Sequence, residues 1–77
     1  MSKESLQEAV LKNLEKYFRD LGEEPASNIY DMVVNAVEKP MLEVVMTRAD
    51  SNQSQAAEML GINRNTLRKK LQQHGLL

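Results

Sequence analysis

Hydrophobic residues in the first part of the chain recur every three or four positions, the spacing of one face of an α-helix. Between Ser5 and Leu21 the intervening positions are mostly Lys, Glu and Gln, which predicts an amphipathic helix. Gly22 should end this helix, and the stretch from Pro25 to Asn28 predicts a loop followed by a helix N-cap. The hydrophobic positions of the first helix are Leu6, Ala9, Val10, Leu14, Tyr17, Phe18 and Leu21.

A second hydrophobic run begins at Ile29 and predicts a long helix that reaches Met46. Pro40 lies inside this run, and a proline within a helix removes one backbone hydrogen bond and crowds the carbonyl four residues earlier. We expect a kinked helix because the hydrophobic spacing continues in phase across Pro40; a break into two helices is the alternative. The hydrophobic surface is broader than one short helix can cover, so we expect a second subunit to bury it.

A different pattern begins at Asn52, where the sequence reads NQSQAAEMLGINRNTLRKKL. Asn52 followed by Gln55 predicts a capped helix start, and Gly61 predicts a left-handed end to that helix. Asn63 is a second favoured N-cap, so another helix should follow a short turn. The positions expected to face inward are Ala56, Ala57, Met59, Leu60, Leu67 and Leu71, with Ile62 filling the turn. The pattern therefore predicts a helix-turn-helix.

The second short helix carries its basic residues outward, and no acidic residue interrupts them. In a helix-turn-helix, this helix enters the major groove of DNA with its first residues nearest the bases. Arg64 is the best candidate base reader, since its guanidinium can pair with O6 and N7 of guanine. Asn63 could read adenine or only cap the helix, while Thr66, Lys69 and Lys70 better suit phosphate oxygens. An ordinary solvated helix face is the alternative, which the two caps and the turn in register disfavour.

The run from Asn52 to Leu71 resembles the C-terminal helix-turn-helix of the Fis family, the factors for inversion stimulation. The segment VEKPMLEVVM, residues 37–46, also resembles the proline-containing long helix of that family. The resemblance covers nearly the whole chain and implies a homodimeric, nucleoid-associated transcription regulator that binds and bends double-stranded DNA. It implies DNA contacts from Asn52, Ser54, Asn63, Arg64, Thr66, Arg68, Lys69 and Lys70.

The chain differs in three respects from the best-known enterobacterial member of that family. Gln55, Gln72 and Gln73 stand where that member has basic residues, so the resemblance implies weaker non-specific DNA binding. The sequence begins almost directly at the first predicted helix, without the arm that contacts recombinases there, so we do not expect recombination enhancement. The alternative function is a protein-interaction adaptor whose helix-turn-helix binds RNA polymerase or a site-specific recombinase.

Charge is divided unevenly along the 77 residues. Residues 1–50 hold six basic and ten acidic residues, a balance of −4, whereas residues 51–77 hold four basic residues and one acidic residue, a balance of +3. This division favours a DNA-binding module, residues 51–77, on an acidic dimerisation core, residues 1–50. Cysteine is absent, and no hydrophobic segment indicates a membrane span or a signal peptide, so we expect a cytoplasmic protein without disulfides.

No residue pattern indicates catalysis, a metal or another cofactor. His74 is the only histidine, expected at the surface or as a helix C-cap, and no cysteine can complete a metal or nucleophilic site with it. Glu23 and Glu24 are adjacent, and adjacency alone does not create an acid/base pair. The sequence thus predicts a non-enzymatic, all-α subunit of four helices. Two long helices should form an intertwined dimer core, joined in one compact domain to a C-terminal helix-turn-helix.

Overall fold

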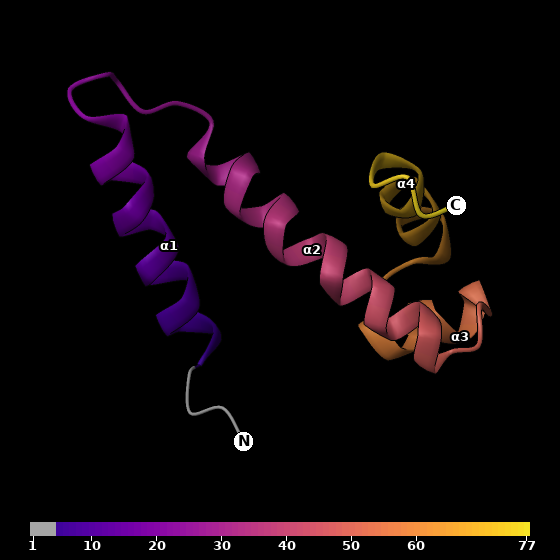
Figure 1. Cartoon of the computed structure of the whole chain (residues 1–77). Coiled ribbons are helices and arrows are strands. Elements are labelled where there is room, and N and C mark those ends of the chain that lie inside the picture. The colour runs from indigo at the N-terminus through magenta and orange to yellow at the C-terminus, as the bar shows by residue number, and fades with distance from the viewer. Residues whose placement is uncertain (1–4) are drawn as a thin grey trace. The chain divides into compact units, whose positions relative to one another are not determined.

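The computed structural model describes residues 5–77, which form helices α1 (Leu6–Leu21), α2 (Ile29–Arg48), α3 (Gln53–Leu60) and α4 (Arg64–Gln73) (Figure 1). Residues 5–77 contain no β-strand, so the predicted all-α fold of four helices is confirmed. None of the helices in this range is both long enough and apolar enough to cross a lipid bilayer.

Helix α1 begins and ends where the sequence predicts. Ser5 forms a capping box, in which its Oγ accepts a hydrogen bond from the Glu8 N–H at 3.1 Å and the Glu8 carboxylate accepts one from the Ser5 N–H at 3.4 Å. Gly22 ends the helix, and its N–H donates to the Phe18 carbonyl at 3.3 Å. No residue of α1 is buried, and its hydrophobic residues Leu6, Leu11 and Phe18 are exposed.

Helix α2 continues without interruption through Pro40. The alternative of two separate helices is therefore wrong, while the expected kink at Pro40 stays a prediction. The chain divides within α2 into two compact units, one ending at Val33 and the other spanning Val34–Leu77. The larger part of α2 thus folds together with α3 and α4.

The hydrophobic core of the second unit joins residues from α2, α3 and α4. Its buried members are Leu42, Ala49, Ala56, Ala57, Leu67 and Leu71, and the half-buried Leu60 and Ile62 pack against them. The predicted packing of Leu67 and Leu71 against the first motif helix is confirmed. The prediction for Met59 is wrong, because 52% of this residue is exposed. With only eight residues, α3 reaches the core through Ala56, Ala57 and Leu60, and Met59 lies outside that face.

The backbone conformation of the connection between α2 and α3 was not predicted from the sequence. Asp50 and Ser51 both adopt left-handed conformations, with φ angles of 55° and 66°. The Ser51 N–H donates to the Met46 carbonyl at 2.9 Å, and the Asn52 N–H donates to the Ala49 carbonyl at 3.0 Å. These bonds satisfy carbonyls at the end of α2 and direct the chain into α3.

Candidate nucleic-acid interface

The turn between α3 and α4 forms as the sequence predicts. Gly61 is the C-cap of α3 in a left-handed conformation, with φ of 75° and ψ of 30°. Its N–H donates to the Ala57 carbonyl at 2.9 Å, and the Ile62 N–H donates to the same carbonyl at 3.0 Å. Ile62 is half-buried against the core, where it anchors the turn. The turn therefore holds α4 in a defined position on α3.

Both predicted asparagine caps are present. The Oδ1 of Asn52 accepts a hydrogen bond from the Gln55 N–H at 3.1 Å, and the Oδ1 of Asn63 accepts one from the Asn65 N–H at 2.7 Å. Reading adenine with both ends of an asparagine amide uses the oxygen as well as the nitrogen. Because the cap already uses the Asn63 oxygen, its amide N–H groups are the part best placed to contact a ligand.

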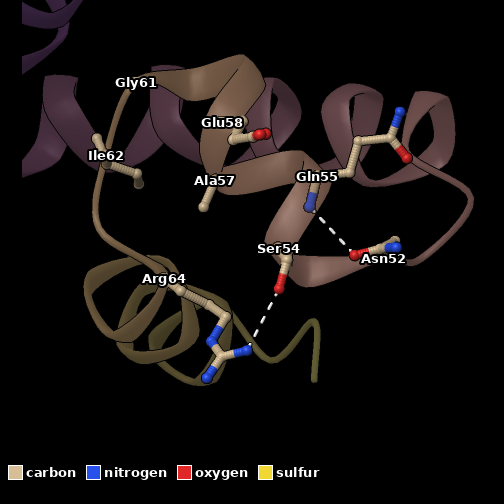
Figure 2. A pocket seen from close by; sticks show the side chains of 8 residues that line it. All are labelled: Asn52, Ser54, Gln55, Ala57, Glu58, Gly61, Ile62 and Arg64. Carbon is tan, nitrogen blue, oxygen red and sulfur yellow. Dashed lines mark hydrogen bonds between the residues drawn. The ribbon is translucent and has the colours of Figure 1, made fainter.

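Arg64 and Ser54 link the starts of the two motif helices. The Nη1 of Arg64 donates to the Oγ of Ser54 at 3.3 Å, across an open hollow that Glu58 also lines (Figure 2). Both Arg64 and Ser54 are exposed to solvent. Water can replace either partner of this long, exposed hydrogen bond, so the guanidinium can leave it for another acceptor at small cost.

Helix α4 has one exposed basic side and one buried hydrophobic side. Leu67 and Leu71 are fully buried, while the exposed side carries Arg64, Arg68 and Lys69. Within residues 5–77, neither Arg68 nor Lys69 forms an ion pair. Both are therefore exposed cations without an acidic partner in the described part of the chain. The remaining predicted contact residues Asn52, Ser54, Asn63 and Thr66 are also exposed.

Lys70 is placed differently from the other predicted contacts. Its Nζ lies 2.7 Å from Oε2 of Glu38 on α2, and Nε2 of His74 lies 2.8 Å from Oε1 of the same carboxylate. Glu38 is only 8% exposed. Hydrogen bonds from Lys70 and from His74 hold the pKa of the Glu38 carboxyl below its ordinary value, although burial opposes this shift.

The sequence pattern did not predict the contacts of Glu38 and His74. His74 is the C-cap of α4, as predicted, but its side chain is 7% exposed, so the surface position is wrong. A signal for Glu38 was present, because Glu38 lies four residues before the buried Leu42 on α2, and the buried Ala49, just after the helix, follows Leu42 by seven. An acidic residue in register with buried residues predicts a basic partner on the facing helix.

Comparison with known proteins identifies the family. Residues 34–74 match the family model described as bacterial regulatory protein, Fis family. The chain belongs to the Fis family. A protein of Ralstonia nicotianae described as Fis-like and DNA-binding is 58% identical over 77 residues, which cover all of both chains. A protein of Neisseria meningitidis serogroup A with the same description is 54% identical over 72 residues, 94% of this chain and 91% of the relative.

A third Fis-family relative carries the family name itself. The DNA-binding protein Fis of Actinobacillus succinogenes is 48% identical over 71 residues, which are 92% of this chain and 72% of that protein. The segment that matches the Fis family model begins at the residue where the second compact unit begins, Val34. The matched segment therefore includes the part of α2 that carries Glu38 as well as the helix-turn-helix.

Residues 5–77 contain no group of three or more His, Asp or Glu side chains arranged to hold a metal ion.

Proposed function

We propose that this Fis-family chain is a homodimeric regulator of transcription that binds and bends duplex DNA on the bacterial nucleoid, with α4 in the major groove. The observation that carries the proposal is the exposed side of α4, where Arg68 and Lys69 have no acidic partner within residues 5–77. Phosphate groups are the partners that such a surface attracts. The names of three relatives, which describe them as DNA-binding, support the same function.

The positions on the motif suggest a role for each contact. Arg64 begins α4 and is the candidate reader of guanine, reaching the base after it leaves Ser54. Asn52 and Ser54 at the start of α3 suit the DNA backbone, as do Thr66, Arg68 and Lys69. Asn63 keeps its capping role and offers its amide N–H groups to the DNA. Lys70, which the sequence also suggests, has its own ligand in Glu38.

The DNA-binding proposal is tested by measuring affinity for random and selected duplexes at several salt concentrations. We expect Arg64→Ala to reduce discrimination at one guanine of each half-site by about 1–3 kcal/mol. Lys69→Ala should weaken binding to most sequences and make the salt dependence less steep, because one phosphate contact is lost in each chain. Lys39→Ala is the matched control, since Lys39 is an exposed cation of α2 outside the motif.

Two results would contradict this proposal. Wild-type affinity that does not change between about 50 and 200 mM salt would exclude phosphate-dominated binding. Equal binding by wild type, Arg64→Ala and Lys69→Ala would favour the adaptor function, in which the motif contacts another protein.

The homodimer proposal rests on hydrophobic surface that the single chain leaves exposed. A hydrophobic hollow runs along α1, lined in part by Leu11, Leu14 and Phe18. On α2, Val44 is 60% exposed and Tyr30 is 79% exposed. Monomeric proteins rarely expose hydrophobic faces of this extent. A second copy of the chain presents the same faces and would bury them symmetrically.

A pair of neighbouring substitutions on α1 tests the dimer. Phe18→Glu places a carboxylate on the hydrophobic face, where dimerisation would bury it at a cost of several kcal/mol. Arg19→Glu places the same group on the adjacent polar position. Sedimentation equilibrium should find a dimer for wild type and Arg19→Glu and a shift to monomer for Phe18→Glu. A wild-type monomer at micromolar concentration would contradict the proposal.

A further inference from the structure

The carboxylate of Glu38 lies between α2 and the C-terminal end of α4. Its two oxygens accept contacts from Lys70 at 2.7 Å and from His74 at 2.8 Å. Lys70 and His74 are four residues apart, so successive turns of α4 present both groups to the same carboxylate. Glu38 is the one charged or polar residue that is buried within residues 5–77. The site is therefore an internal ion pair rather than a surface contact.

Burial makes this pair difficult to separate. A carboxylate removed from water is strongly destabilised unless a cation and hydrogen-bond donors compensate it. Lys70 supplies the ammonium, and the side chain of Lys70 is 33% exposed against 10% for Glu38. If Lys70 moved to a DNA phosphate, Glu38 would stay behind in a largely buried position with His74 alone. A phosphate contact by Lys70 therefore has to compete with an internal ligand that Lys69 does not have.

Lys69 and Lys70 are adjacent in the sequence but lie in different environments. Neighbouring residues of an α-helix point about 100° apart, so Lys69 lies on the exposed side while Lys70 turns toward α2. Gln73 extends the same contact, because its Nε2 donates to Oδ1 of Asn35 on α2 at 3.2 Å. The polar contacts between α2 and α4 thus continue the hydrophobic seam formed by Leu42 and Leu71.

We propose that Glu38 is a positioning residue for α4: it withholds the Lys70 ammonium from DNA and fixes the C-terminal end of α4 against α2. The charge offered to phosphate is then that of Arg64, Arg68 and Lys69. This inference rests on the proposed DNA binding, and it assigns different roles to two adjacent lysines of the motif.

The salt dependence of DNA affinity separates these roles. The steepness of log K against log salt falls by about 0.9 for each phosphate contact that is removed. We expect Lys69→Met to reduce the steepness by about 0.9 for each bound chain. The double variant Glu38→Gln/Lys70→Met should keep the wild-type steepness, and it removes the carboxylate and the ammonium together. Glu38→Gln alone should increase the steepness, because the released ammonium becomes available to phosphate.

Each outcome of this experiment has one meaning. A reduced steepness in the double variant, equal to that of Lys69→Met, would show that Lys70 contacts phosphate and would overturn the inference. A steepness in Glu38→Gln that does not exceed the wild-type value would overturn the withholding role. A change of packing alone lowers affinity without increasing the steepness, so the increase is specific to the proposal. Salt-independent binding by wild type and Lys69→Met would instead contradict the proposed DNA binding itself.

Discussion

Two residues with left-handed backbone, Gly61 and Ser51, frame helix α3 and differ in how well they suit that conformation. Gly61 has φ of 75° and pays no steric cost, since it has no Cβ. Ser51 has φ of 66° and carries a side chain that disfavours it. The strain at Ser51 lies in the connection that orients the whole motif on α2.

We predict that Ser51→Gly stabilises the protein. Relief of the left-handed strain outweighs the greater freedom that glycine gives the unfolded chain, for a net gain of about 0.5–1 kcal/mol. Urea denaturation at a fixed protein concentration measures this difference. Ser51→Ala should give no gain, because alanine keeps the Cβ. Equal stability of Ser51→Gly and Ser51→Ala would show that the backbone conformation is not strained.

At the scale of elements, α4 is fixed to its neighbours by different forces at its two ends. The N-terminal end depends on the Asn63 cap and on the turn at Gly61, which are local. The middle depends on burial of Leu67 and Leu71. The C-terminal end depends on Glu38, which lies 32 residues before Lys70 in the sequence. Only this last attachment contains a group whose charge changes in acid.

We predict an acid-dependent contribution of Glu38 to stability. Lys70 and His74 lower the folded-state pKa of Glu38, so its ionised form stabilises the fold above the unfolded pKa, about 4.3. That contribution is lost as the pH falls through the lower folded-state pKa. Glu38→Gln should therefore reduce the free energy of unfolding by about 1–3 kcal/mol at neutral pH. Chemical denaturation of both proteins from neutral pH to below pH 4 should show the difference shrinking in acid. A difference that is constant with pH would contradict the role of the charge.

At the scale of the whole molecule, the proposed function requires two copies of α4 on one DNA duplex. A dimer whose recognition helices lie closer together than one helical turn of DNA can dock both only if the duplex curves. For the proposed dimer, the resemblance to the Fis family implies that the two recognition helices lie this close together.

We predict that binding bends the DNA. A circular-permutation gel, in which one binding site is moved along fragments of equal length, should show the lowest mobility when the site is central. The dimerisation variant Phe18→Glu is the control, because a monomer has one α4 and cannot bend the duplex between two recognition helices. Uniform mobility of all wild-type complexes would exclude bending, even if affinity and salt dependence agree with DNA binding.

The local structure could be predicted because its causes are local in the sequence. The left-handed end of α3 follows from Gly61, the start of α4 follows from Asn63, and the exposed basic side follows from helical spacing around Leu67 and Leu71. These residues act through backbone geometry and periodicity, which neighbours a few positions away determine. The hydrophobic spacing that stays in phase across Pro40 likewise predicted one continuous α2.

What the sequence by itself determined was therefore the order of the helices, the turn of the motif and the identity of its basic residues. The tertiary structure decided which side chains are exposed and which charges are paired. Met59 fits the helical pattern of α3 yet is exposed, and Lys70 fits the basic pattern of α4 yet pairs with Glu38. The physical reason is that the exposure and the charge pairing of residues on α3 and α4 depend on the surface of α2 that packs against the motif. Helical periodicity within α3 or α4 does not describe that surface.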